Sequence, residues 1–174
     1  MHYTLDNTLD AVPLRLNSES FWQFSLTFYP NVKTVCLRWQ NEYQANVNVL
    51  LALCYAEYLA WQVVPASLPS ALVSLQTVNL QLTQTLRHCR GRLTDLPIST
   101  EQHRLLKESL LNCELVAESV EQHLICQSLH FRPQVQPYNL EHYSDTLESA
   151  TAKTLTDDIV DLRQALVILK THTV

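Results

Sequence analysis

A single glycine, Gly91, is the feature that most limits how this chain of 174 residues can fold. Average usage would give about twelve glycines in a chain of this length. Tight β-hairpin turns and phosphate-binding loops both depend on glycine, the first for positive φ and the second for close backbone approach. The shortage therefore argues against a β-rich fold and against nucleotide-binding loops of the P-loop or dinucleotide type.

The rest of the composition is that of one folded helical domain. Hydrophobic residues make up 47% of the sequence and charged residues only 17%, so the chain can bury a substantial core. We predict an all-α fold, a single-domain bundle of about six or seven helices over residues 1–174. Five cysteines without a C-x-x-C pair, and an N-terminus without a basic and apolar leader, predict a reduced, cytoplasmic protein.

Prolines and polar clusters divide the chain into segments of helix length. Pro30 and Pro65 are expected to end helices, because proline has no N–H to continue the hydrogen-bond ladder. The segment 46–64, capped by Asn46 or Asn48, is apolar nearly all round, which is typical of a central helix. The expected helices, with approximate bounds, are 18–29, 31–43, 46–64, 70–90, 100–129, 140–149 and 157–171.

The segments 70–90 and 100–129 are expected to pair as a long antiparallel helical hairpin. Each carries apolar residues three and four positions apart, so that each has one apolar stripe to face the other. Gly91 stands where a left-handed helix C-cap would lie. The stripe residues are Leu75, Val78, Leu82, Leu86 and Cys89 on the first segment, and Leu106, Leu110, Cys113, Ala117, Val120 and Leu124 on the second.

The charge balance narrows the class of partner. Twelve basic against 17 acidic residues give a formal net charge of −5, which disfavours nucleic acid and anionic membrane surfaces. The most apolar run, about eight residues from Val49 to Ala56, is far shorter than the ~20 that a membrane crossing needs. We expect no nucleic-acid partner, no membrane span and no cofactor.

The first third of the chain carries several motifs in a fixed order. They are Phe21-Trp22-Gln23-Phe24, Tyr29-Pro30-Asn31-Val32, Cys36-Leu37, Gln40-Asn41 and Asn46-Val47-Asn48-Val49-Leu50. This order resembles the proteobacterial family called domain of unknown function 2390, whose pattern has a Trp-x-Phe opening, a Pro-Gly-Val, a Cys-Leu-x-Leu-Gln-Asp and an Asp-Val-Asn-Leu-Leu-Leu. A weaker likeness at Ala117-Glu118-Ser119-Val120 and Asn139-Leu140 extends the resemblance along the chain. It implies an all-helical protein and no particular activity.

The chain departs from that family pattern at three positions. Asn31 and Gln44 stand where the pattern has glycine, and Asn46 stands where it has aspartate. Asparagine still caps a helix but carries no charge, so an acid or metal-ligand role at this position is not expected. The residues that the resemblance retains, and that we take as candidate binding residues, are Trp22, Gln40 and Asn48.

Asp157, Asp158 and Asp161 form an Asp-Asp-x-x-Asp sequence. In prenyl-transferring enzymes such aspartates lie on one helix face and hold magnesium on a diphosphate. The structural interpretation, which we favour, is that Thr156 caps the last helix and the acids occupy its first turn, near the positive end of the helix dipole. The three aspartates remain the metal-ligand candidates of an alternative hypothesis, a small metal-dependent enzyme or ligand-binding bundle.

His123, Cys126 and His130 share one side of the segment 100–129, because they are three and four positions apart. Imidazole and thiolate are zinc ligands, but the sequence offers no evident fourth ligand. The Glu-x-x-His spacing of di-iron bundles is also absent from the sequence. The simpler interpretation is that Cys126 packs as a small apolar residue and the histidines lie on a solvated face.

Glu114, Glu118 and Glu121 flank the apolar stripe of the segment 100–129. Such acids usually form a solvated flank. If the hairpin turns near its middle, they have no basic residue opposite them on the preceding segment. We expect them to face solvent, another helix or the basic surface of a partner.

Arg87 and Arg90 lie on the flank of the segment 70–90 that faces those acids. With a turn near residue 95, Arg87 would lie opposite His103, far from the three glutamates at 1.5 Å of rise per residue. We therefore expect the two arginines to reach Glu101 or Glu108.

Glu57 is a lone acid in the apolar segment 46–64. An ionised carboxylate without a partner is costly to bury, so Glu57 should be hydrogen-bonded, paired or peripheral. Gln40, Asn46 and Asn48 are its candidate neighbours in a small polar pocket, although helix capping also explains both asparagines. Cys36 is expected to be packed, not reactive, because its sequence neighbours do not argue for an activated thiolate.

No catalytic set stands out in the sequence, which favours a non-enzymatic role. We predict a helical interaction protein, accessory or regulatory, that works through a surface with a protein partner. Self-association through exposed aromatics at Phe21, Trp22 and Phe24 is a further possibility. The candidate binding residues are Trp22, Gln40, Asn48, Glu57, Glu114, Glu118 and Glu121.

Overall fold

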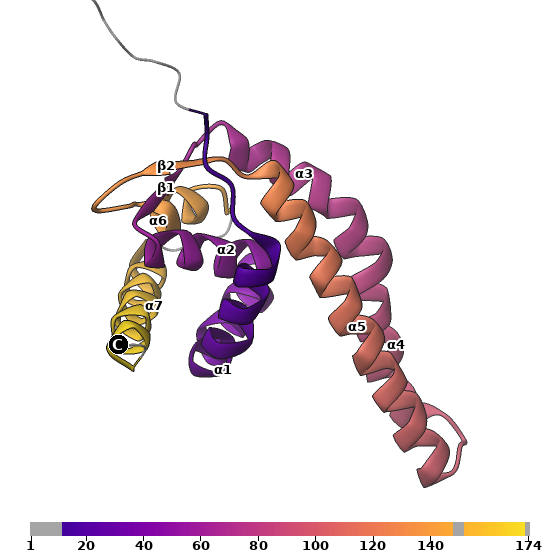
Figure 1. Ribbon diagram of the computed structural model, residues 1–174. Helices are drawn as coiled ribbons and strands as arrows, with labels where there is room; N and C mark the ends of the chain where they lie inside the picture. The colour runs from indigo at the N-terminus through magenta and orange to yellow at the C-terminus, as the bar shows by residue number, and fades with distance from the viewer. Residues whose placement is uncertain (1–11, 148–151, 173–174) are drawn as a thin grey trace, which may run out of the picture.

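A computed structural model describes residues 12–147 and 152–172 of the chain (Figure 1). It confirms the predicted all-α fold and adds one short two-stranded sheet. Among the described helices, none combines the length and apolar character that a membrane crossing requires. In chain order the elements are α1 (Ser18–Tyr43), α2 (Val47–Tyr58), β1 (Trp61–Val63), α3 (Ser67–Val78), η1 (Asn79–Thr83), α4 (Gln84–Gly91), η2 (Leu93–Asp95), α5 (Thr100–Ser128), β2 (Phe131–Pro133), α6 (Asn139–Ser144) and α7 (Ala152–His172).

α1 is one continuous helix of 26 residues, so the prediction that Pro30 separates two helices is wrong. Pro30 itself is exposed, and the buried side chains recur every three or four residues on both sides of it. Burial of that single stripe outweighs the ~3 kcal/mol that an interior proline costs a helix. Asn17 caps the helix by accepting from the Ser20 N–H at 2.9 Å. The buried stripe is Phe21, Phe24, Ser25, Phe28, Val32, Val35, Cys36, Trp39 and Tyr43.

The predicted central helix is present but shorter than expected. α2 begins after Asn46, whose side chain accepts from the Val49 N–H at 3.1 Å. It ends at Tyr58 instead of Val64, because Ala60 takes a left-handed φ of 58° and leads the chain into β1. β1 pairs antiparallel with β2, a role that suits the aromatic and β-branched residues of 61–63.

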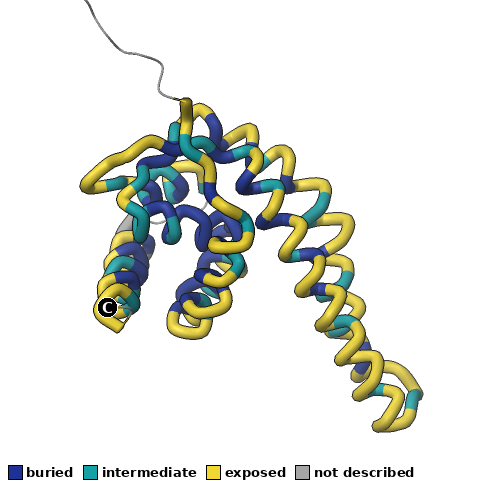
Figure 2. The backbone as a smooth tube through the Cα atoms, viewed as in Figure 1, coloured by how far each residue is buried: buried dark blue, intermediate teal, exposed yellow. Residues whose placement is uncertain are grey.

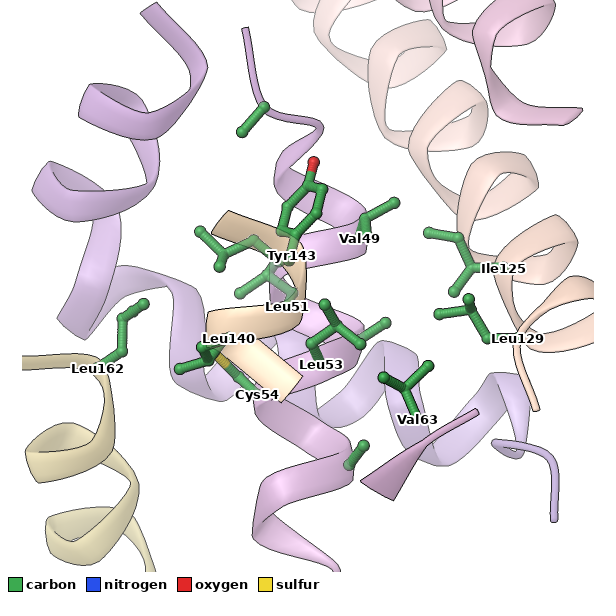
Figure 3. Packing of buried hydrophobic residues seen from close by; sticks show 14 of the residues in the cluster. Val49, Leu51, Leu53, Cys54, Val63, Ile125, Leu129, Leu140, Tyr143 and Leu162 are labelled. Carbon is green, nitrogen blue, oxygen red and sulfur yellow. The ribbon is translucent and has the colours of Figure 1, made fainter. Parts of the chain in front are cut away.

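The core surrounds α2. Eight of its 12 residues are buried, which makes α2 the central element of the predicted bundle. Helices α1, α5, α6 and α7 all pack against it. Figure 3 shows Ile125 of α5 pointing toward α2, and Cys54 of α2 beside Leu140 of α6. Segments distant in sequence are thus joined through one helix.

α3, η1 and α4 follow one another directly and pair with α5 as the predicted antiparallel hairpin, here called the arm (Ser67–Ser128). Figure 1 shows the arm diverging from the body of the molecule, and Figure 2 shows that its far half is largely exposed. Within the arm, η1 is a π-helical segment. Gly91 has no positive φ, so the predicted left-handed cap is wrong; a 3₁₀ turn at η2 follows α4 instead.

The predicted apolar stripe of α5 is only partly buried. Of its residues, Ala117 is buried, whereas Leu106, Cys113 and Val120 are exposed. The face of α5 that turns inward carries acids as well as apolar residues. Its buried residues are Glu114, Ala117, Glu121, Gln122, Ile125 and Cys126.

The last helices also differ from their predicted bounds. α6 ends at Ser144, and residues 148–149 of the predicted helix 140–149 lie outside the described residues. α7 begins at Ala152, so Thr156 is not its cap and the Asp-Asp-x-x-Asp sequence lies within the helix. α7 packs against α1, α2 and α6.

Candidate functional site

A groove of about 500 Å³ opens between α1, the first turns of α2, and the arm. Its volume is in the range of ligand-binding pockets. It brings together five of the predicted binding residues, namely Trp22, Gln40, Asn48, Glu114 and Glu118. Its apolar lining is Trp22, Leu26, Tyr29, Pro30, Leu37, Val47, Leu51 and Leu115, and its polar lining is Ser25, Lys33, Gln40, Asn48, Arg87, Arg90, Glu114, Glu118 and Gln122.

One wall of the groove is a single stripe of α1. Its members recur every three or four residues from Trp22 to Gln40 and span about 27 Å at 1.5 Å per residue. Pro30 lies on this wall and has no N–H to donate to the carbonyl of Leu26, which leaves a backbone acceptor there. Burial raises the pKa of the Tyr29 phenol, and the nearby Glu118 carboxylate raises it further.

The opposite wall is built by ion pairs that cross the arm. Arg87 donates to Glu118 through Nη2 at 2.7 Å and to Gln40 of α1 through Nη1 at 3.2 Å. Arg90 holds Glu114 through two hydrogen bonds of 2.6 and 3.1 Å. The hydrogen bond to Glu114 raises the pKa of Arg90. The charges on this wall are therefore largely neutralised by each other.

These pairs show that the expected register of the hairpin is wrong. Arg87 lies opposite Glu118 instead of His103, because the connection after α4 packs against α5 and does not turn tightly near residue 95. Figure 1 shows α5 extending past the end of α4. On that projecting part, Glu101 and Glu108 pair with Arg104 of the same helix at 2.7 and 2.8 Å.

Behind the groove, the carboxylate of Glu121 is completely buried. Asn46 and Asn48 from the start of α2 donate to Oε2 at 3.1 and 3.0 Å. Asn79 donates to Oε1 at 3.0 Å, and the Thr83 hydroxyl donates to the same atom. Asn79 and Thr83 are the two ends of η1, so the π-helical segment supplies half of the donors. Single π-helical segments of this kind often occur at functional sites.

Asn48 and Gln122 connect this buried carboxylate to the groove. Gln122 Nε2 donates to Asn48 Oδ1 at 3.0 Å and to Ser25 Oγ at 3.1 Å. Within the part of the chain that the structure describes, Gln122 Oε1 is buried and accepts no hydrogen bond. Buried acceptors are almost always paired, so this atom is an exception, and it is itself closed to solvent.

The side chains of the groove fall into a few chemical classes. Its described lining contains no histidine and no cysteine, and its hydroxyls are those of Ser25 and Tyr29. The lining offers an apolar surface, charges paired with each other, amide groups and the ammonium of Lys33, which makes no ion pair among the described residues.

The Asp-Asp-x-x-Asp sequence does not come together as a metal site. Asp158 is buried, with Arg38 Nη2 at 3.0 Å from Oδ1 and Trp39 Nε1 donating to Oδ2 at 3.0 Å. Burial raises the pKa of Asp158, against the opposing effects of Arg38 and Trp39. Asp157 and Asp161 are exposed on another side of α7. Over residues 12–147 and 152–172, no group of three or more His, Cys, Asp or Glu side chains is placed to hold a metal ion.

In the predicted group of His123, Cys126 and His130, the first two residues lie in different environments. Both ring nitrogens of His123 are engaged, Nδ1 with Ser18 Oγ at 3.2 Å and Nε2 with Gln127 at 3.0 Å. Cys126 is buried, and burial raises the pKa of its thiol.

Glu57 is paired, as expected, but not with the predicted neighbours. Arg163 of α7 donates to both of its oxygens, at 2.9 and 3.0 Å, and also to Glu141 at 2.6 Å. Asn46 and Asn48 bind Glu121 instead, and Gln40 accepts from Arg87. Glu57 therefore has no part in the groove.

The expectation of exposed aromatics on α1 is wrong for two of the three residues. Phe21 and Phe24 are buried, and they stack against Tyr55 and Phe28. Trp22 is half-buried and lines the groove.

Several site residues were missed at the level of sequence. Glu121 was among the candidate binding residues but its complete burial was not foreseen, and its donors Asn79 and Thr83 were not singled out. A signal was available on α1, where Trp22, Leu26 and Tyr29 continue in helical spacing to Leu37. The assumed break at Pro30 concealed it.

The part of the chain that matches a known family includes the whole groove. The model of the family described as Protein of unknown function (DUF2390) matches residues 20–125, more than half of the chain. The chain belongs to this family. The DUF2390 match includes every residue that lines the groove, from Trp22 to Gln122. No curated protein and no solved structure matches the chain.

Membership of the DUF2390 family also gives Gln44 a structural meaning. The pattern that the sequence resembles has glycine at this position, and Gln44 has a left-handed φ of 57° at the end of α1. Left-handed backbone favours glycine because a Cβ atom is crowded there. The turn between α1 and α2, which brings Asn46 and Asn48 to Glu121, thus keeps its conformation with glutamine in place of glycine.

Proposed function

We propose that this protein is a non-enzymatic interaction protein whose groove receives an amphipathic α-helix from a protein partner. One observation carries the proposal: the groove is walled by two helices, each presenting groove residues every three or four positions. A third helix with the same spacing would pack its side chains between those of the two walls. By binding a helix of its partner, the protein would act in an accessory or regulatory role.

The dimensions of the groove favour a helix over a small molecule. The α1 wall extends for about 27 Å, the length of roughly 18 helical residues. The lining is mostly apolar along α1, from Trp22 to Leu37, with amides at one end. A helix with apolar residues at i, i+3 or i+4, and i+7 matches such a surface.

The charges refine the expected partner. Arg87 and Arg90 are already paired with Glu118 and Glu114. Lys33 makes no ion pair among the described residues, so we expect an acid on the partner helix near it.

We also expect the protein to act in the cytoplasm, because all five cysteines are free thiols. The alternative of a metal-dependent enzyme has less support, because Asp158 is held by Arg38 and Trp39 inside the fold.

Selection from a displayed library of helical peptides, with the full chain as bait, tests the proposal. The selected sequences should share the apolar spacing given above, and one of them serves as a labelled probe in fluorescence anisotropy. Leu26→Glu and Leu115→Glu alter exposed groove residues and should each weaken peptide binding by roughly tenfold or more. Val167→Glu, at an exposed position of α7, is the matched control and should leave binding unchanged. Equal binding by all four proteins would refute the groove as the binding site.

A further inference from the structure

The arm carries a second surface, on the outward side of α5; at its inner end Val120 also borders a hollow beside Ser18 and Trp22 of α1. It consists of seven exposed residues that share one sector of the helix, here called the arm face. Val116 is 65% exposed and Leu106 43% exposed, values unusual for apolar residues in helical spacing. The arm face is Leu105, Leu106, Ser109, Asn112, Cys113, Val116 and Val120.

The arm face contains no charged side chain, although α5 has many. At 100° per residue the seven positions span about 120° of the helix, and the charged residues all fall outside this sector. A charge-free face is unusual on a surface helix, whose exposed side normally carries charges. The charged residues of α5 are Glu101, Arg104, Lys107, Glu108, Glu114, Glu118 and Glu121.

The spacing of the arm face is nearly symmetric about Cys113. Leu106 and Val120 lie seven residues before and after it, and Ser109 and Val116 lie four before and three after. This three-four alternation is the pattern by which helices pair along a seam. If two such helices pair antiparallel with their Cys113 residues opposed, Leu106 of each copy meets Val120 of the other.

From these observations we propose that two copies of the chain associate through the arm face, with Cys113 at the two-fold axis. A two-fold interface places the same surface on both sides, so any net charge on it would repel its own copy. The absence of charge and the near-symmetry about one residue both satisfy that requirement. The groove stays accessible, because Leu115 and Glu118 lie outside the arm face and line the other side of α5.

The association state of the full chain tests this directly. Sedimentation velocity over a range of concentrations should show a reversible dimer. The double variant Val116→Glu, Val120→Glu puts like charges on both sides of the interface and should raise the dissociation constant by roughly tenfold or more. Both positions are exposed in the protomer, so circular dichroism should be unchanged. The variant Val167→Glu on α7 is the control and should dimerise like the wild type. A wild-type monomer at all concentrations, or a double variant that dimerises equally well, overturns the proposal.

Cross-linking tests the position of the axis independently. Cys89 and Cys113 are the exposed cysteines, and Cys36, Cys54 and Cys126 are buried. A short bismaleimide should give a covalent dimer with the Cys89→Ser variant, which keeps Cys113. It should give none with Cys113→Ser, which keeps Cys89. Cross-linking that follows Cys89, or that fails in both variants, shows that Cys113 is not at the axis.

Discussion

Asn48 Nδ2 donates to Glu121 Oε2 at 3.0 Å and so joins the first turn of α2 to the middle of α5. The same amide accepts from Gln122, which lines the groove. The position of the arm relative to α1, and with it the width of the groove, therefore depends on a buried carboxylate that no cation neutralises by direct contact in the described part of the chain.

Replacing Glu121 with glutamine should destabilise the fold. The new amide would bring its own hydrogens against two of the four donors that now point at the carboxylate. We expect a loss of about 2–4 kcal/mol in the free energy of unfolding, measured by urea titration. Glu108→Gln on the exposed part of α5 is the matched control and should change little. Equal stability of the two variants would contradict the role given to the buried network.

Two ion pairs of the arm, one buried between its helices and one exposed within α5, should be coupled to very different extents. A double-mutant cycle on Arg90 and Glu114, of which Glu114 is buried, should give a coupling energy of about 1–2 kcal/mol. The exposed pair of Arg104 and Glu101 has the same kind of geometry and should give no measurable coupling. Similar coupling for both pairs would mean that burial does not strengthen the arm contacts.

The sequence was sufficient for the fold class, because apolar spacing and the shortage of glycine both report on helices. The predicted break of α1 at Pro30 was wrong, because the helix-breaking tendency of proline was given more weight than the buried stripe that continues from Phe21 to Tyr43. The end of α2 depends on the pairing of β1 with β2, about 70 residues away along the chain. The sequence of residues 61–63 alone does not indicate that this segment pairs with residues 131–133.

The site was only partly accessible from sequence for a similar reason. Trp22, Gln40 and Asn48 were identified through the family resemblance, and they do meet in the groove. The pairing of Arg87 with Glu118 and of Arg90 with Glu114 was missed because the register of the hairpin was inferred from a tight turn. Register in a helical hairpin is set by packing between the helices and by the path of the connection, and neither is readable from helical spacing alone.

Arg163 should be a major contributor to the stability of the C-terminal helix. Arg163→Leu leaves Glu57 buried without its partner, so we expect a loss of about 3 kcal/mol in unfolding free energy. The double variant Glu57→Leu, Arg163→Leu removes the uncompensated charge and should recover part of that loss. Arg132→Leu, at an exposed position of β2, is the control. If the double variant is no more stable than Arg163→Leu, the stranded charge is not the cause.

The five thiols should fall into two classes of reactivity. Burial raises the pKa of Cys36 to about 12, and it raises the pKa of Cys54 and Cys126 as well. These three thiols stay protonated and shielded in the folded protein at about pH 8. A thiol-reactive disulfide reagent should therefore modify Cys89 and Cys113 rapidly and the buried thiols only on unfolding. Rapid modification of Cys36 in the native protein would contradict the packing of α1.

The same shift predicts a loss of stability in alkali. The folded state raises the pKa of Cys36 from 9.0 to about 12, so it favours the neutral thiol. The resulting stabilisation is complete below pH 9.0 and is lost as the pH rises toward 12. The urea concentration at the midpoint of unfolding should be constant near neutral pH and should fall above pH 9.0. The fall should be shallower in the Cys36→Ala variant. A midpoint that rises with pH in this window would contradict the sign.

The account depends most on the groove as the binding surface, and amide chemical-shift mapping of the full chain with a selected helical peptide tests it most directly. The predicted result is a set of perturbed signals on α1 from Trp22 to Gln40 and on α5 from Leu115 to Gln122, including the indole N–H of Trp22. Perturbations confined to α7 or to the arm face, with the Trp22 and Gln122 signals unmoved, would contradict it.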